Sequence, residues 1–135
     1  INEEEAKQLT GQDHLPDAAK AIIKLGPNST VIKRGEYGAT LFGDNFSFAA
    51  PAYPLERVVD PTGAGDSFAG GFMGYLASVD KVDEESLRTA AIAGSTMASF
   101  AVEDFGLDNV KNLTKSDIDE RFKAFVDLTR FNPLT

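Results

Sequence analysis

Residues 60–68, Asp-Pro-Thr-Gly-Ala-Gly-Asp-Ser-Phe, decide how the rest of the chain is interpreted. The apolar stretch before them predicts a short strand over 55–60, and the apolar run that begins at Phe68 predicts a helix from about Gly63. The glycines lie where that helix would expose unpaired backbone N–H groups and a partial positive charge, and they let an anion approach the backbone. The segment therefore predicts an anion-binding turn at a helix N-terminus.

Two well-known phosphate-binding patterns do not fit this turn. No Lys-Ser or Lys-Thr pair follows the glycines, as a Walker A loop requires, and the glycine spacing differs from that of the dinucleotide-binding fingerprint. Asp66 itself has two interpretations. It is either a helix-capping carboxylate, which stabilises by roughly 1 kcal/mol, or a general base that accepts a proton from an attacking hydroxyl while the backbone amides hold the transferred group. Local physics leaves both open.

Outward from this turn, the apolar periodicity predicts two helices, a group of strands and then three helices. This order is typical of an α/β layer arrangement. In the last helix Ile118, Phe122, Phe125 and Val126 form an apolar stripe, and Arg121 is expected to point outward. The helices are expected over 3–10, 17–25, 63–78, 84–102 and 115–131, and the strands over 30–33, 39–42, 45–49 and 55–60.

Composition excludes several classes of function for the 135 residues. The formal net charge of −8 argues against a nucleic-acid partner. The absence of cysteine excludes disulfides and Cys-ligated metals, and the single histidine, His14, excludes a multi-His zinc site. The longest apolar run, 68–77, is too short to span a bilayer, so no membrane partner is expected. No signal peptide opens the sequence, and a cytoplasmic location is expected.

Three segments resemble one family, in the same order along the chain. Residues 60–72, D-P-T-G-A-G-D-S-F-A-G-G-F, are similar to the C-terminal signature of the ribokinase-like (PfkB) carbohydrate kinases. Residues 2–5, N-E-E-E, resemble that family's N-x-x-E motif, and residues 31–39, V-I-K-R-G-E-Y-G-A, resemble its strand-turn segment on the nucleotide side. The resemblance covers essentially the whole chain. It implies that residues 1–135 are a single partial domain, the C-terminal part of a three-layer α/β/α fold.

The resemblance implies ATP-dependent phosphorylation of a sugar or sugar-like hydroxyl. Asp66 would be similar to the base that deprotonates that hydroxyl. Gly63, Ala64 and Gly65, with the Asp66 amide, would form the anion hole for the transferring phosphoryl group. Phosphoryl transfer depends mainly on positioning and charge stabilisation, which such a turn supplies.

The resemblance also implies ATP, Mg²⁺ and a monovalent cation such as K⁺ as cofactors. Asn2 and Glu5 would hold the Mg²⁺–phosphate assembly through water, because Mg²⁺ keeps much of its hydration. Asp60 would lie nearest the monovalent cation. The structural alternatives are a helix N-cap for Asn2, a solvated first-turn glutamate for Glu5 and a strand-end cap for Asp60.

The nucleotide would lie against two further segments. Lys33 and Gly35 would be near its phosphates and ribose, with a strand-end surface lysine as the alternative for Lys33, and Gly38 would serve the turn of the same segment. The small-residue face of the 84–102 helix would flank the adenine, or it would only allow close helix packing. This face contains Gly94, Ala98 and Ser99.

The family's N-terminal half, which brings the sugar-binding residues and the lid, has no counterpart in these residues. The acceptor is therefore left open between a sugar and a nucleoside such as adenosine, and an open site loses electrostatic advantage. The chain alone is expected to be a poor kinase and to expose apolar surface, which predicts a homo-oligomer or a retained N-terminal half as partner. The alternatives from other classes are a non-catalytic nucleotide-binding module and a purely structural fragment.

Overall fold

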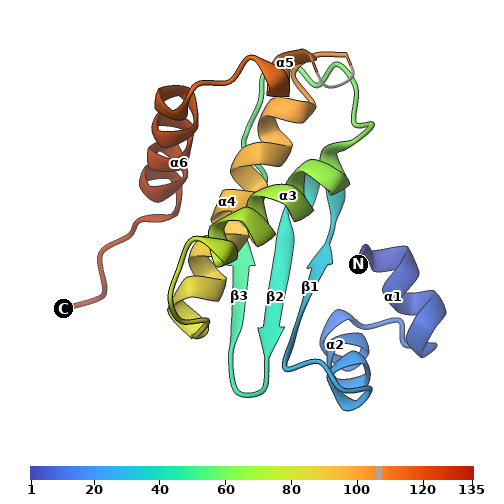
Figure 1. The fold of residues 1–135 in the computed structure, drawn as a ribbon. Coiled ribbons are helices and arrows are strands. Elements are labelled where there is room, and N and C mark those ends of the chain that lie inside the picture. The colour runs from blue at the N-terminus through green and yellow to red at the C-terminus, as the bar shows by residue number, and fades with distance from the viewer. Residues whose placement is uncertain (106–107) are drawn as a thin grey trace.

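Helices and strands follow one another in blocks, as shown for residues 1–105 and 108–135 by a computed structural model (Figure 1). Two helices precede three strands, and the remaining helices follow them, so the α/β class is confirmed. The elements are α1 (Glu3–Thr10), α2 (Leu15–Lys24), β1 (Ser29–Lys33), the 3₁₀ turn η1 (Gly35–Tyr37), β2 (Ala39–Gly43), β3 (Ser47–Ala50), α3 (Ala64–Ala77), α4 (Glu84–Ala101), α5 (Asp108–Lys111) and α6 (Lys115–Thr129).

The strands form an antiparallel sheet in the order β1-β2-β3. The register places Ile32 opposite Thr40 and Leu41 opposite Phe48. On the outer side of β1, Asn2 forms a parallel bridge with Lys33, and the Lys33 N–H donates to the Ile1 carbonyl at 2.9 Å. The start of the chain is thereby fixed beside the end of β1.

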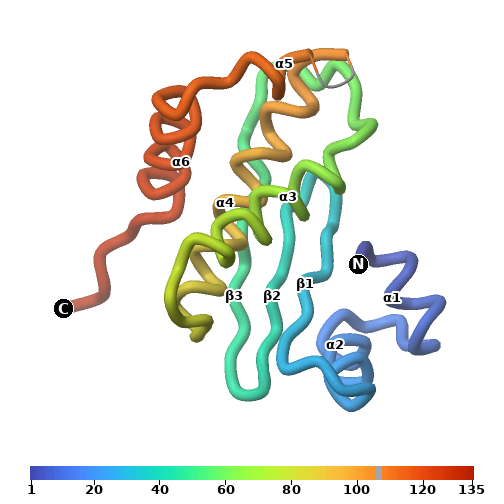
Figure 2. The backbone as a smooth tube through the Cα atoms, in the orientation of Figure 1, coloured from blue at the N-terminus to red at the C-terminus, as the bar shows by residue number. Residues whose placement is uncertain are grey.

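Helices cover both faces of this sheet because side chains alternate between the faces along each strand. Ile32 packs with Ala19 and Ile22 of α2 in one cluster of buried side chains. On the opposite face Ala50 belongs to a second cluster, with Ala91 of α4 and Phe125 of α6. The result is three layers, with α1 and α2 on one side of the sheet and α3, α4 and α6 on the other (Figure 2).

Two glycines allow α3 and α4 to approach closely. A Cβ atom placed on Gly71 would lie 2.6 Å from the Ala93 carbonyl oxygen, and one placed on Gly94 would lie 2.9 Å from the Phe68 carbonyl oxygen. Neither position has room for a side chain. The glycine-rich sequence of α3 is therefore required by its packing against α4.

The predicted fourth strand, 55–60, is wrong. The chain between β3 and α3 forms no regular strand, and Pro51 and Pro54 restrict its pairing. The N–H groups of Val59 and Asp60 instead donate to one acceptor, the Val102 carbonyl at the end of α4, at 2.8 and 3.4 Å. An apolar stretch of strand length is thus tied to a helix end rather than to a sheet.

The apolar stripe of α6 also differs from the prediction. Phe125 is fully buried, but Val126 is 48% exposed. Arg121, expected to point outward, has a side chain only 16% exposed and lies against α4. The short helix α5 was not expected from the sequence.

A largely apolar cavity of about 350 Å³ lies along the outer edge of β1, beside α3. Val31, Phe68, Phe72 and Met73 contribute to its lining, and Met73 is 60% exposed. Phe68 is buried, so this edge exposes only part of the apolar surface that was expected. Among the residues that the structure describes, no helix is both long and apolar enough to cross a membrane.

Candidate functional site

The Gly63–Gly65 turn begins α3 in the way that the sequence predicts. Gly63 is the N-cap, with a φ of 82° in the left-handed region that favours glycine. The Ala64 N–H donates to the Pro61 carbonyl at 3.2 Å, and the Ser67 N–H donates to the Gly63 carbonyl at 2.9 Å. The Gly65 and Asp66 amides lie between these two donors, and neither has a hydrogen-bond acceptor among residues 1–105 and 108–135. Two donors at the positive end of a 14-residue helix are therefore free to bind an anion.

Lys33 brings a positive charge to this turn. The last residue of β1 lies on the sheet face that α3 covers, and its Nζ atom is 3.0 Å from the position of a Cβ on Gly65. A side chain at position 65 would require the ammonium group to shift by a few tenths of an ångström. The structure thus brings together two residues that the sequence assigned to neighbouring parts of the site, and the helix dipole and the ammonium group act in the same direction.

Asp66 lies in the first turn of α3, and its side chain is exposed. The helix-capping interpretation does not hold, because the N-cap is Gly63 and no side-chain hydrogen bond caps this helix. The carboxylate belongs to the same first turn of α3 as the free Gly65 and Asp66 amides. It is accessible to an incoming hydroxyl group.

Asp60 shapes the entry to the turn. One of its carboxylate oxygens, Oδ1, accepts the Thr62 N–H at 2.9 Å, and this backbone hydrogen bond is the main reason why the pKa of Asp60 is lowered. Asp60 therefore acts as a cap, which was the structural alternative for this residue. The segment that it caps is a turn, and not the strand that the sequence predicted.

Asn2 and Glu5 bind each other in a capping box at the start of α1. The Asn2 side chain accepts the Glu5 N–H at 2.8 Å, and the Glu5 carboxylate accepts the Asn2 N–H at 2.8 Å. The parallel bridge to Lys33 fixes this helix start next to the end of β1, and Glu3 pairs with Arg34 at 3.1 Å. The sequence assigned three segments to the phosphates of the nucleotide: the start of α1, the end of β1 and the glycine turn before α3. These segments thus meet at one end of the sheet (Figure 1).

No group of three Asp, Glu, His or Cys side chains able to hold a metal ion occurs in 1–105 and 108–135. A metal at this site would rest on fewer side chains, supplemented by water and by the phosphates of a ligand. That mode is common for Mg²⁺.

Gly35 and Gly38 bracket η1, as the strand-turn segment predicted. Both have positive φ values, 57° and 84°. The Gly38 carbonyl accepts the Arg34 N–H at 2.7 Å, and a Cβ on Gly38 would collide with the backbone at Ala50 and Ala52. Gly38 therefore serves the turn, whereas Gly35 is exposed with open space around it.

The small residues of α4 are not equivalent. Gly94 faces Phe68 of α3, and Ser99 is buried, with its hydroxyl donating to the Thr96 carbonyl at 2.6 Å. Ala98 is half-buried and makes no such polar contact. The close-packing alternative is therefore present for Gly94 and Ser99, and a role beside adenine stays a prediction.

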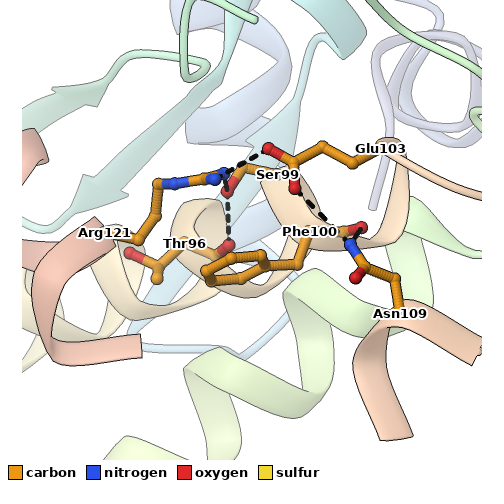
Figure 3. A network of polar contacts seen from close by, with 6 residues as sticks. All are labelled: Thr96, Ser99, Phe100, Glu103, Asn109 and Arg121. Carbon is orange, nitrogen blue, oxygen red and sulfur yellow. Dashed lines mark hydrogen bonds and ion pairs between the residues drawn. The ribbon is translucent and has the colours of Figure 1, made fainter. Parts of the chain in front are cut away.

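The sequence interpretation missed a polar network at the end of α4 (Figure 3). Arg121 donates to Ser99 Oγ at 2.8 Å and to Glu103 Oε1 at 2.7 Å. Asn109 donates to the Phe100 carbonyl at 3.0 Å. One signal was available, because Arg121 lies one helical turn before the buried Phe125 and must share its face.

Comparisons with known proteins agree with this arrangement. The pfkB family carbohydrate kinases match residues 1–114. The cytidine kinase of Thermococcus kodakarensis is 46% identical over 77 residues, which are 55% of this chain and 27% of that protein. The aminoimidazole riboside kinase of Salmonella typhimurium is 35% identical over 102 residues, 76% of this chain and 32% of that protein.

A solved structure extends the likeness to the fold. The aminoimidazole riboside kinase from Salmonella enterica, complexed with aminoimidazole riboside and an ATP analog, superposes with a TM-score of 0.77 at 30% identity and covers 90% of this chain. The matched part of the chain spans 40% of that structure and 27% and 32% of the two curated relatives. The family match over residues 1–114, together with the glycine turn and its lysine, gives the conclusion that this chain belongs to the pfkB family of carbohydrate kinases.

Proposed function

We propose that this chain is the nucleotide-side portion of a kinase that transfers a phosphoryl group from ATP to a hydroxyl of a sugar or nucleoside. The observation that carries the proposal is the meeting of Lys33 with the Gly63–Gly65 turn, where free amides, a helix dipole and an ammonium group converge beside an exposed carboxylate. The relatives named above are kinases of nucleoside-type acceptors, and one of them was solved with an ATP analog.

In this proposal the chain's own groups have two roles, which are to stabilise negative charge and to accept a proton. The Gly65 and Asp66 amides and the Lys33 ammonium stabilise the negative charge on the transferring phosphoryl group. Asp66 accepts the proton of the attacking hydroxyl group. The hydroxyl oxygen at the same time forms the new bond to phosphorus, and the bond from phosphorus to the ADP oxygen breaks. Both roles need groups that are fixed before the reaction, and a helix N-terminus supplies such groups.

The residues at the start of α1 fit a hydrated Mg²⁺. Asn2 and Glu5 offer amide and carboxylate oxygens, the ligand type that Mg²⁺ prefers, but each already serves the capping box. In the proposal they therefore bind water molecules of the ion rather than the ion itself. Asp60, held ionised by its hydrogen bond from Thr62, would contribute negative charge to a monovalent cation.

The test is a panel of acceptors with the full-length protein. MgATP binding is measured by calorimetry, and ADP release is measured with free sugars and with nucleosides, including ribose, fructose, cytidine and adenosine. Acceptor-dependent ADP release supports the proposal. MgATP binding without transfer to any acceptor identifies a nucleotide-binding module, and absence of MgATP binding identifies a structural protein.

A further inference from the structure

The guanidinium group of Arg121 lies outside the candidate site and is enclosed by α4, α6 and the segment that follows β3. The Tyr53 ring centroid is 4.3 Å from the Arg121 Cζ atom, and the Phe100 ring centroid is 4.2 Å from it. Hydrogen bonds to Ser99 and Glu103 complete the enclosure (Figure 3). The planar guanidinium group suits both kinds of contact, since it stacks on rings and donates in its plane.

These contacts fix the C-terminal turn of α4. Ser99 lies in the last turn of the helix and Glu103 follows it, and Arg121 binds both. Asn109 contacts the second Glu103 oxygen at 3.4 Å and donates to the Phe100 carbonyl. The carbonyl groups at a helix C-terminus otherwise lack partners within the helix, so the turn depends on such contacts for a single geometry.

The same helix end holds the entry to the glycine turn. The Val102 carbonyl accepts the N–H groups of Val59 and Asp60, and Asp60 in turn accepts the Thr62 N–H. Residues 51–63 form no helix or strand that could fix their position. Tyr53 anchors the beginning of this segment on Arg121, and Val102 anchors its end.

We propose that Arg121 is a positioning residue for the anion-binding turn. Arg121 holds the last turn of α4 in place. The Val102 carbonyl at the end of that turn fixes the position of residues 59–62, and these residues in turn determine the position of the Gly65 and Asp66 amides. The proposal rests on the proposed function for its catalytic consequence. A displacement of about 1 Å at a phosphoryl-binding turn can lower turnover about a hundredfold without any change in the reacting groups.

The experiment compares Arg121→Met, Arg121→Lys and Glu103→Gln in the full-length protein. The methionine variant keeps an apolar stem between Tyr53 and Phe100 but loses the hydrogen bonds, and the glutamine variant keeps the shape while removing the charge. Lys123→Met is the matched control, because Lys123 is an exposed cation on the same helix. Thermal unfolding verifies that each variant folds.

The first measurement is amide hydrogen exchange of residues 57–67. We expect exchange in this segment to rise at least about tenfold in Arg121→Met and Glu103→Gln, less in Arg121→Lys, and not in Lys123→Met. A rise in exchange that is confined to α4 and α6 in these variants, with residues 57–67 as protected as in the wild type, would overturn the proposal.

The second measurement is steady-state turnover. We expect kcat to fall about tenfold to a hundredfold in Arg121→Met, with the KM for the acceptor unchanged and partial recovery in Arg121→Lys. A normal kcat in a folded Arg121→Met protein would also overturn the proposal. Hydrogen exchange is measured without any enzymatic turnover. A wild-type protein that phosphorylates no acceptor would therefore refute the proposed function. The exchange result would still decide whether Arg121 positions residues 57–67.

Discussion

The Lys33 ammonium nitrogen lies 3.0 Å from the place that a Cβ would occupy on Gly65. One residue ends a strand and the other begins a helix, 32 positions later by the numbering of the sequence. Their contact is possible because β1 presents Lys33 on the face that α3 covers and because position 65 has no side chain. It brings the strand-turn segment and the glycine turn together in the candidate site.

Gly65→Ala should separate activity from stability. The added methyl group would lie 3.0 Å from the Lys33 Nζ atom, so the ammonium group must move away from the turn, and we expect turnover to fall about tenfold. Alanine is at the same time the better helix former, so the free energy of unfolding should hold or rise, by up to about 1 kcal/mol. Gly74→Ala in the same helix, with open space around position 74, is the control. It should show the gain in stability and normal turnover in the same two assays.

Lys33→Met should weaken phosphate binding and transfer without unfolding the protein. Methionine keeps the apolar stem of the side chain but removes the charge beside the glycine turn. We expect the KM for ATP to rise and kcat to fall, about a hundredfold together in kcat/KM. Lys20→Met, at an exposed position of α2, should leave both constants unchanged. Equal kinetics in the two variants would remove Lys33 from the site.

Gly38→Ala should destabilise the fold more than Gly35→Ala. Both positions have a positive φ, which costs about 1–2 kcal/mol for alanine. Only Gly38 faces backbone, where a Cβ would also lie 2.8 Å from the Ala52 N atom. We therefore expect Gly38→Ala to lower the free energy of unfolding by about 1–3 kcal/mol beyond Gly35→Ala. Denaturant unfolding of the two variants measures this difference, and similar midpoints would contradict the close approach.

Two carboxylates in helix capping boxes should make stability depend on acid pH: Asp83 is the N-cap of α4, and Asp117 lies in the first turn of α6. The Ser86 N–H hydrogen bond lowers the pKa of Asp83, and the Thr114 side-chain and backbone hydrogen bonds lower the pKa of Asp117, both from an ordinary value of 3.8. A lowered pKa in the folded state contributes stability that is present above the unfolded value and is lost as pH falls through the folded value.

Unfolding followed between about pH 5 and pH 2 should therefore show a falling midpoint below about pH 4. Asp83→Asn keeps a good N-cap but cannot titrate, so its midpoint should fall less steeply with acid than that of the wild type. An unchanged slope in Asp83→Asn and in Asp117→Asn would show that these carboxylates do not link protonation to folding.

Local chemistry explains which parts of the fold could be predicted. The cap at Asn2 and the glycine turn at Gly63 are decided by near neighbours in the sequence, and each lies where it was expected. Burial alternates between successive residues along β2 and β3, but not along β1. Helix and hairpin boundaries agree within a few residues because they also depend on near neighbours.

Long-range hydrogen bonds explain the failures. Residues 55–60 have the pattern of a strand, but the partner of Val59 and Asp60 is a carbonyl at the end of α4, which no local pattern reveals. Arg121 has the charge of a surface residue, and its burial depends on two rings and a carboxylate from other elements. In the candidate site, the family resemblance assigned Lys33 and Gly65 to neighbouring parts of the site, but it did not predict the contact between them.

The central claim is that Asp66 accepts the proton of an acceptor hydroxyl while the turn of α3 holds the transferred phosphoryl group. The most direct test is single-turnover transfer from ATP to the best acceptor by the full-length protein and its Asp66→Asn variant, with ATP affinity measured in parallel and Asp127→Asn as an exposed control. We predict that Asp66→Asn slows transfer by about 10²- to 10⁴-fold with near-normal ATP affinity. Transfer at nearly the wild-type rate in Asp66→Asn would contradict the assignment.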